Sequence, residues 1–460
     1  MKTIAQSLAE LASSIRYGAL PAEVVAETKR RLLDAVGCAL AGHDSGPARA
    51  IRHLISDLGG RAESTVFGER ARTSCEKATL ANSTMLRYLD YMDSHAGPDP
   101  CHPCFNIPAC LAVAERAGAS GRALIEAIVT GYEIHIRFQE SAGDPDIGSR
   151  GWFSGTHLQF SVPLAAGKLL GLDPERLTHA VAIAATHSNS LNALSRGSIP
   201  SSKSIADGMI AANAVVAALL AERGITGPQD IMESRGGFIR AVAGKVDGDR
   251  LLAPVQTYRI MEVNTKYFNT IRMAQTAVAG ALRLVQEHGL KWTDLASVTV
   301  YLPTREHASH EGIWNDPSRL RPQNRDSANH SIAFSLAAGL VDGELGPEQY
   351  REEKLRDPDV LSLVDKISLQ ADPALDAHWP KAAVTRVALR ARGGKSYEAT
   401  TLYPPGHHRN PLTDEQLNEK FRRLAKAVLS AARAQRVIET VARLDELSSA
   451  AELTRQLRPH

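Results

Sequence analysis

Apolar residues recur at helical spacing through roughly the first 260 residues, and this pattern limits the fold more than any other feature of the chain. Residues 20–43 are one example, with Pro21 near the expected helix start and Gly42 at the expected stop. Residues 211–224, "AANAVVAALLAERG", are so rich in Ala that closely packed helices are favoured over a β sandwich. The first part of the chain is therefore expected to be mostly α.

The pattern changes near residue 290, where β-branched residues begin to alternate with polar ones. Residues 295–303, "LASVTVYLP", and residues 383–404, which contain a "GG" turn, predict strands of a small sheet. Between them, residues 330–343 and 352–367 have a helical pattern, and amphipathic helix returns after about residue 406. The second part of the chain is therefore expected to mix helices with a sheet.

The length of 460 residues exceeds what one hydrophobic core usually supports. The simplest division is a large helical domain formed by both chain ends, residues 1–268 plus 406–460, with a smaller α+β domain, residues 269–405, inserted between them. The predicted fold class is thus mainly α.

Composition excludes several classes of function. The 53 basic and 51 acidic side chains nearly balance, no long basic block occurs and aromatic residues are only 5% of the chain, so nucleic-acid binding is not expected. Polar residues interrupt the apolar runs, so neither a membrane span nor a signal peptide is expected. Five cysteines, an odd number, predict reduced thiols and a cytoplasmic location.

The segment "LDYMDSHAGPDPCHPC", residues 89–104, concentrates titratable side chains where prolines prevent a regular helix. Asp90, Asp93 and Ser94 close a helix-like run, and His102 follows on a loop. An imidazole titrates near neutral pH, and an acidic neighbour can fix its tautomer and raise its basicity. The segment therefore predicts a proton-transfer group, whereas the structural alternative is two helix-capping Asp and a surface His.

The cysteines of this segment suggest a metal or a redox pair as further alternatives. Cys101 and Cys104 form a CxxC, and Cys110 extends it to a spacing that could serve an iron–sulfur cluster. The chain lacks a second CxxC and a strand leading into this one, so thiols that shape a pocket wall are favoured over ligands.

Two further segments carry cations at expected helix starts. In "SRGSIPSSKSIADG", residues 195–208, small hydroxyl residues surround Lys203 and could cradle a carboxylate or phosphate. In "NTKYFNTIRMAQTAVAG", residues 264–280, Lys266 and Arg272 lie near the predicted domain junction, where ligand sites are common. Solvated surface cations are the alternative for both segments.

Taken together, in this order, the three segments resemble the MmgE/PrpD family, which contains 2-methylcitrate dehydratase, cis-aconitate decarboxylase and iminodisuccinate epimerase. The resemblance runs nearly end to end, because residues 165–177, 325–345 and 403–421 also look like family signatures. It implies a helical domain built from both chain ends, an inserted α+β lid domain and a homodimer. It also implies catalysis without a cofactor or metal, on small di- or tricarboxylates.

The residues that match the family's motifs are Asp90, Ser94 and His102 in the first segment and the two lysines, Lys203 and Lys266. Arg325 and His330 fall in the lid signature "RDSANHS".

Three departures from the family pattern are visible. The family's paired acids are Met92 and Asp93 here. Phe153 stands where members often have His, with His157 four positions later, and Met273 replaces another His beside Arg272.

These matches predict a lyase in which His102 transfers the proton, Asp90 orients it, and lysines neutralise substrate carboxylates. Dehydration of a 2-methylcitrate-like hydroxy acid is the first expectation, with decarboxylation or epimerisation of a related carboxylate as alternatives. A non-catalytic carboxylate-binding dimer and an iron–sulfur hydratase are the remaining readings. The predicted catalytic residues are His102, Asp90, Lys203 and Lys266, and the predicted substrate-binding residues are Asp93, Ser94, His157, Arg272, Arg325 and His330.

Overall fold

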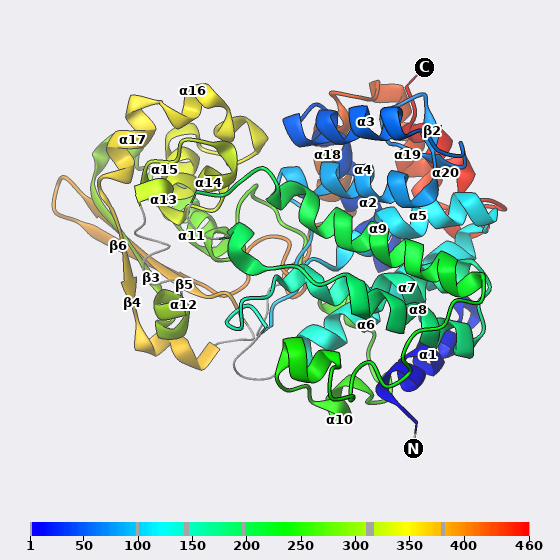
Figure 1. Cartoon of the computed structure of the whole chain (residues 1–460). Helices are drawn as coiled ribbons and strands as arrows, with labels where there is room; N and C mark the ends of the chain where they lie inside the picture. Colours follow the sequence, from blue (N-terminus) through cyan, green and yellow to red (C-terminus); the bar gives the residue numbers. More distant parts are fainter. Residues whose placement is uncertain are drawn as a thin grey trace. The chain divides into compact units, whose positions relative to one another are not determined.

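The computed structural model describes residues 2–97, 101–141, 147–195, 198–309, 317–378 and 382–459. It is 60% helical and 9% strand, which confirms the predicted mainly α fold with a smaller α+β part. The chain forms two compact units: unit 1 is Met1–Ala193, Ser202–Val263 and Thr413–His460, and unit 2 is Leu194–Ser201 and Asn264–Leu412 (Figure 1). The assignment of Leu194–Ser201 to unit 2 corresponds to no sequence pattern.

Unit 1 is a helical assembly to which both ends of the chain contribute (Figure 1). Local signals set several of its helix ends: Thr3 caps the first helix in a capping box with Gln6, and the helix predicted after Pro21 ends at Gly42 as expected. Its elements are α1 Ile4–Ser14, α2 Ala22–Ala41, α3 Gly46–Leu58, β1 Ser64–Thr65, β2 Arg72–Thr73, α4 Cys75–Tyr88, α5 Asn106–Ala117, α6 Gly121–Ser141, α7 Leu158–Leu169, α8 Pro174–His187, α9 Lys203–Glu222, α10 Gly248–Leu251, α18 Asp414–Ala425, α19 Ala431–Ala442 and α20 Ala451–Thr454.

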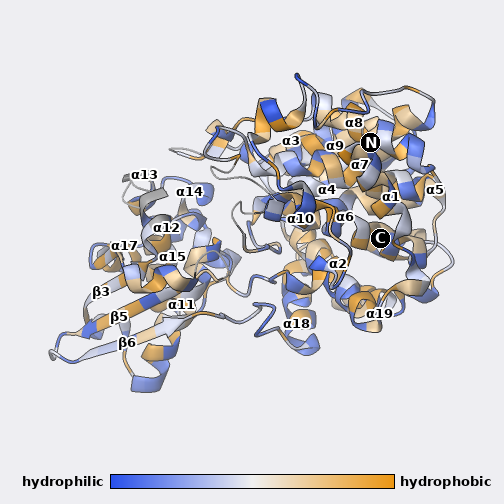
Figure 2. Ribbon diagram, turned by 90° about the horizontal axis from the view of Figure 1, so that it is seen from below, coloured by the Kyte–Doolittle hydropathy of each residue, from blue (hydrophilic) through white to orange (hydrophobic). Residues whose placement is uncertain are grey.

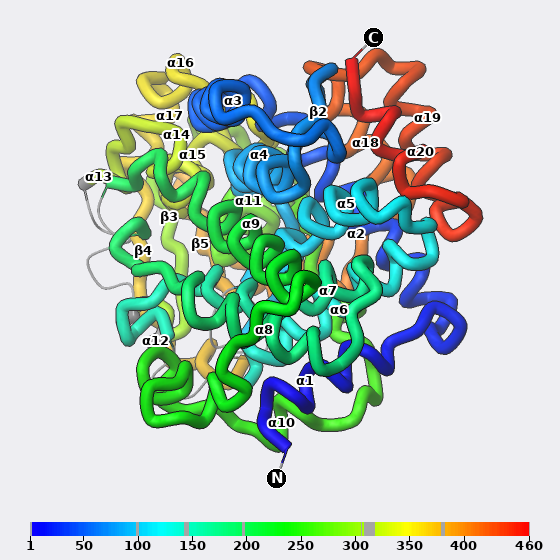
Figure 3. Tube along the Cα trace, turned by 45° about the vertical axis from the view of Figure 1, so that its right-hand side comes forward, coloured from blue at the N-terminus to red at the C-terminus, as the bar shows by residue number. Residues whose placement is uncertain are grey.

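Helix α9 lies inside unit 1, where it packs against α4, α7 and α8 (Figure 3). It is long and apolar enough to cross a membrane by length and composition, but 61% of its most apolar window is buried within the protein. The buried core helix of a soluble protein can have the same length and composition as a membrane span. Apolar residues also recur along the neighbouring helix α7 (Figure 2). The close packing of α4 on α9 brings a charged group of each helix, described below, close together.

Unit 2 contains a four-stranded sheet in the order β4-β3-β5-β6. The strands β3 and β4 are parallel, whereas β5 pairs antiparallel with β3 and β6. Along β3, Val298, Val300 and Leu302 are fully buried and their neighbours are more exposed, so one face of the sheet joins a core with α11 and α15. The elements are α11 Arg272–His288, β3 Leu295–Leu302, α12 Thr304–Ser309, α13 Pro317–Leu320, α14 Arg325–Asn329, α15 Ile332–Asp342, α16 Glu352–Leu355, α17 Pro358–Val364, β4 Ile367–Ala371, β5 Thr385–Ala391 and β6 Ser396–Thr401.

The sequence prediction was incomplete for residues 352–371. The predicted helix over 352–367 divides into α16 and α17 because Asp357 caps a new helix in front of Pro358. Its last residue, Ile367, instead begins the edge strand β4, which the sequence analysis did not predict. The short hairpin of β1 and β2 was also missed.

Candidate active site

The segment predicted to carry proton-transfer chemistry follows the end of α4. Asp90 lies two residues beyond the helix with a φ of +50°, and among the described residues it is the one non-glycine with a positive φ. The chain then forms an isolated bridge between His95 and Cys101 and enters α5 through a short turn at Pro103–Phe105. Residues 98–100, which include two of the predicted loop prolines, lie outside the described residues.

His102 is held by a backbone group. Its Nδ1 lies 2.7 Å from the carbonyl oxygen of Asp93. A carbonyl oxygen can only accept a hydrogen bond, so Nδ1 carries the proton and Nε2 is the basic nitrogen of the neutral ring. The hydrogen bond of Nδ1 is thus made to the Asp93 main chain, and the predicted role of the Asp90 carboxylate in orienting and charging the His102 ring stays a prediction.

Asp93 was predicted to bind substrate, but both of its carboxylate oxygens are engaged inside unit 1. The Tyr132 hydroxyl donates to Oδ2 at 2.7 Å, and the Cys104 amide donates to Oδ1 at 3.2 Å. Burial raises the pKa of this carboxyl, while the nearby Arg31 guanidinium and the Tyr132 hydrogen bond oppose the rise. These contacts fix the Asp93 backbone, so its side chain serves to aim the carbonyl that holds His102. Ser94 beside it is also buried.

Asp90 pairs with a residue that the sequence analysis missed. Arg87, in the last turn of α4, donates from Nη1 to Asp90 Oδ1 at 2.7 Å, and both side chains are buried. The Nε of Arg87 also lies 3.4 Å from Oδ2 of Asp207 on α9. The spacing of Arg87 three residues before Asp90 could have indicated the first pair, whereas nothing local indicates the second.

Lys203 is the first residue of α9 and is only 7% exposed. The alternative of a solvated surface cation therefore does not hold for Lys203. Lys203 interacts electrostatically with Asp207, one turn further along the helix. Part of the predicted Ser-rich cradle, residues 196–197, lies outside the described residues.

His157 ends a short 3₁₀ turn, η3 Ser154–His157, and is 2% exposed. Its ring stacks on Phe138 with centroids 6.1 Å apart and meets the ring of His135 edge-on at 6.3 Å. Burial lowers the pKa of His135 well below its usual value, and the neighbouring His157 and His102 contribute to the shift. His135, which the sequence analysis did not select, is therefore neutral at physiological pH.

The cations predicted near residue 270 belong to unit 2. Lys266 is 3% exposed, so it is not a surface lysine. Arg272 begins α11, and its Nη2 lies 3.1 Å from a carboxylate oxygen of the buried Glu306. An internal carboxylate thus already engages the guanidinium that was expected to grip a substrate acid.

The two residues of the predicted lid signature also lie in unit 2. Arg325 donates to Asn269 at 3.3 Å and lies over the ring of Tyr350. Nδ1 of His330 donates to the carbonyl of Asp326 at 2.8 Å, which leaves Nε2 as the basic nitrogen, as in His102.

The candidate residues therefore divide between the two units. Those in unit 1 are Asp90, Asp93, Ser94, His102, His157 and Lys203, and those in unit 2 are Lys266, Arg272, Arg325 and His330. That both sets serve one substrate stays a prediction.

Asp207 gives the site a measurable pH signature. Burial raises the pKa of its carboxyl from 3.8 to about 6, although Arg87 and Lys203 oppose the shift. Because the folded pKa exceeds the unfolded one, this group contributes stability below the unfolded pKa, and the contribution is lost as pH rises through about 6. When the pH is lowered from about 7.5 to about 4.5, the unfolding free energy of the wild type should rise by about 2 kcal/mol more than that of Asp207→Asn.

Urea unfolding at several pH values measures this difference. Asp230→Asn, at an exposed position, is the control and should run parallel to the wild type. If the unfolding free energies of the wild type and Asp207→Asn change with pH in the same way, the buried carboxyl does not titrate in this range.

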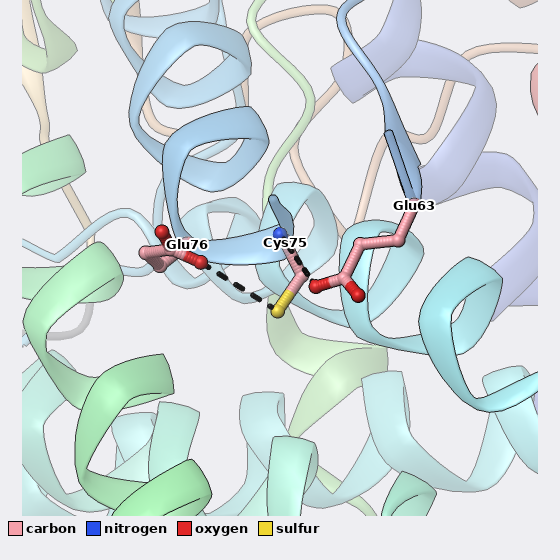
Figure 4. A group of neighbouring side chains, drawn as sticks. All are labelled: Glu63, Cys75 and Glu76. Carbon is pink, nitrogen blue, oxygen red and sulfur yellow. Dashed lines mark hydrogen bonds between the residues drawn. The ribbon is translucent and has the colours of Figure 1, made fainter. Parts of the chain in front are cut away.

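Two clusters in the described residues have ligand-type atoms within 4.8 Å of one another. In the first, Cys75 begins α4 between Glu63 and Glu76, with its sulfur directed toward Glu76 (Figure 4). Burial, followed by the charge of Glu63, raises the pKa of the Cys75 thiol to about 12, and Arg116 bonds both oxygens of Glu63. The Cys75 thiol is therefore protonated, and the Glu63 carboxylate beside it is already paired with Arg116.

The second cluster is His95, Glu140 and Glu262. Nε2 of His95 lies 3.8 and 3.9 Å from the two carboxylates, and Arg259 Nε lies 3.0 Å from Glu140. Arginine therefore supplies positive charge to this cluster as well.

The thiols of the CxxC segment are buried. Burial raises the pKa of Cys104 and of Cys110, and Asp93 adds to the shift at Cys104. Protonated, buried thiols are inert as nucleophiles. That they shape a pocket wall stays a prediction.

Unit 1 of this mainly helical chain holds the His102 ring in one tautomer and also buries Asp90, Asp93 and Lys203, which are side chains suited to acid–base chemistry on a charged substrate. Comparison with known proteins agrees with this class. Family models described as the MmgE/PrpD N-terminal domain and the MmgE/PrpD C-terminal domain match residues 6–250 and 268–446. The chain belongs to the MmgE/PrpD family, as its motifs indicated, and is an enzyme of that type.

Curated relatives align over nearly the whole chain at low identity. A cis-aconitate decarboxylase-like protein of Aspergillus oryzae is 26% identical over 98% of this chain and 96% of its own length. Human cis-aconitate decarboxylase is 25% identical over 100% of this chain and 95% of its own. The 2-methylcitrate dehydratase of Cupriavidus necator is 26% identical over 85% of this chain and 84% of its own.

Proposed function

We propose that this protein is a cofactor-independent lyase that acts on a small di- or tricarboxylate by moving a proton at the carbon next to a carboxylate. The observation that carries the proposal is the hydrogen bond from His102 Nδ1 to the Asp93 carbonyl, which fixes Nε2 as the basic nitrogen. Relatives named as 2-methylcitrate dehydratases and cis-aconitate decarboxylases support the substrate class.

Dehydration of a 2-methylcitrate-like hydroxy acid is the first reaction. His102 Nε2 takes the proton, the C–H electrons form the double bond, and the β-hydroxyl leaves as water with the proton that the His102 imidazolium gives back. Lys203 binds the neighbouring carboxylate of the substrate and neutralises its negative charge, which grows as the proton leaves. His157 is the predicted contact of another substrate group in unit 1, and Lys266, Arg325 and His330 are the contacts that the family motifs predict in unit 2.

Decarboxylation of an unsaturated tricarboxylate is the second candidate, and the comparisons favour it in one respect. The relatives named as decarboxylases align with 95–100% of this chain, whereas those named as dehydratases align with 85–90%. The same imidazole would then protonate the carbanion left when CO₂ departs.

Proton NMR in deuterium oxide distinguishes these reactions. The purified enzyme, treated with a chelator, is incubated with 2-methylcitrate, citrate, cis-aconitate and smaller dicarboxylates. Dehydration gives an unsaturated acid, decarboxylation gives a deuterated product and CO₂, and epimerisation gives exchange with inversion. Substrate binding without exchange or product across the panel would contradict the proposal and favour a non-catalytic carboxylate-binding protein.

We also propose a cytoplasmic homodimer. On α9, the apolar side chains of Met209, Val216 and Leu220 are 44%, 37% and 36% exposed, and their spacing places them on one face of the helix. The odd number of cysteines supports the location. Sedimentation velocity on the wild type tests the oligomeric state, and a monomer at micromolar concentration would contradict it.

A further inference from the structure

Asp207 lies where three segments of unit 1 that are distant in sequence come together. Its side chain, on the first turns of α9, is buried, and it faces Arg87 from the end of α4. The other charged groups that act on it are Lys203 on its own helix and Asp90 beyond α4. From η3 the neutral residue Gly155 packs against it.

The contact with Arg87 reaches Asp90. One guanidinium lies 3.4 Å from Asp207 through Nε and donates to Asp90 at 2.7 Å through Nη1. Asp90 is in the left-handed region, which costs an L-residue energy unless surrounding contacts hold it there. The guanidinium, fixed at its other side by Asp207, supplies such a contact.

Lys203 acts on Asp207 through its charge. A cation in the first turn of a helix faces the positive end of the helix dipole, and α9 has no acidic residue in its first turn. Asp207 lies one turn along the same face and supplies a compensating negative charge, and the Lys203 ammonium in turn lowers the pKa of Asp207.

The contact with η3 requires a glycine. A Cβ built on Gly155 would lie 2.6 Å from Oδ1 of Asp207, closer than real Cβ contacts. The Phe153 ring would lie equally close to that Cβ, at 2.6 Å, so a larger residue here would force the Asp207 carboxylate, the Phe153 ring or both to move.

From this geometry we infer that Asp207 is a positioning residue, which holds Asp90 through Arg87 and offsets the charge of Lys203 one turn away on α9, in the arrangement that catalysis requires. The inference rests on the proposed function, because it concerns the same site. It adds two residues, Arg87 and Asp207, to the set that the family motifs indicate.

Asp207→Asn keeps the shape of the side chain and removes its charge. We expect kcat/KM to fall by about 10- to 100-fold, with kcat lowered through Asp90 and KM raised through Lys203. A residue that only stabilised the fold would change the amount of folded enzyme and leave both constants per folded site unchanged. Asp230→Asn is the matched surface control.

The double variant Arg87→Gln/Asp207→Asn tests the route of the effect. If Asp207 acts through Arg87, the kcat/KM of the double variant should lie within about threefold of the kcat/KM of the worse single variant. Independent effects would instead multiply the two losses. Should the Arg87 variants fail to fold, Gly155→Ala displaces the carboxylate from the other side, and we expect it to reproduce the rise in KM.

Crystal structures of the wild type and Asp207→Asn separate this inference from the proposed function. We expect the φ of Asp90 to leave the left-handed region, or the Lys203 side chain to move, in the variant. A wild type that converts none of the panel acids would refute the proposed function, and the crystal comparison would still decide whether Asp207 positions these groups. Unchanged Asp90 and Lys203, or unchanged kcat and KM, would overturn the inference.

Discussion

His102→Asn should lower turnover by about two to four orders of magnitude while leaving the fold intact. The Asn side-chain amide can donate to the Asp93 carbonyl in place of Nδ1, so the orienting hydrogen bond survives. What the variant loses is the basic nitrogen. Turnover of the best panel substrate, measured at saturation, reports this loss.

Substrate affinity provides the control for His102→Asn. The lysines that neutralise the substrate carboxylates are unchanged, so calorimetric binding of the same acid should stay within about tenfold of the wild type. Wild-type turnover in the variant would remove His102 from the mechanism and leave the proposed chemistry without its base.

Lys420→Met should destabilise the protein by about 3–5 kcal/mol. Lys420 on α18 lies 2.7 Å from Asp34 on α2, both side chains are at most 5% exposed, and the ammonium also donates to the Tyr91 carbonyl. Removing the lysine leaves the Asp34 carboxylate without its nearest cation inside the core, where an uncompensated charge is costly. Urea unfolding at neutral pH measures the loss.

A second variant separates charge from packing at this position. Asp34→Leu combined with Lys420→Met removes both charges, and we expect it to recover most of the lost stability, since buried ion pairs are often replaceable by apolar residues. Lys426→Met, at an exposed position on the same stretch of chain, should change stability by less than about 0.5 kcal/mol. A Lys420→Met effect no larger than this control would mean that the pair does not hold the two chain ends together.

The sequence predicted those parts of the fold that depend on local patterns. The helix that begins after Pro21 and ends at Gly42, and the strands β3, β5 and β6, follow from periodicity and from turn residues. The edge strand β4 was missed because its five residues follow a helix without a turn signal, and it is defined by its partner β3. A strand of this kind is identified by pairing rather than by composition.

The sequence indicated which residues belong to the candidate site, but it did not indicate which contacts they make. His102, Lys203 and the acids around residue 90 stand out as chemistry-bearing residues in unusual segments. The hydrogen bond that fixes the His102 tautomer comes from a backbone carbonyl, which every residue possesses, so no sequence pattern marks it. The link between Arg87 and Asp207 joins two helices that are far apart in the chain, and it follows only from the packing of α4 on α9.

The most direct test of the central claim is the tautomer of His102, measured by ¹⁵N NMR of histidine-labelled protein, with His102→Asn used to assign the resonance. At pH above the ring's titration, we predict a protonated Nδ1 and an unprotonated, basic Nε2. A ring protonated at Nε2 would point the wrong nitrogen at the substrate and contradict the account.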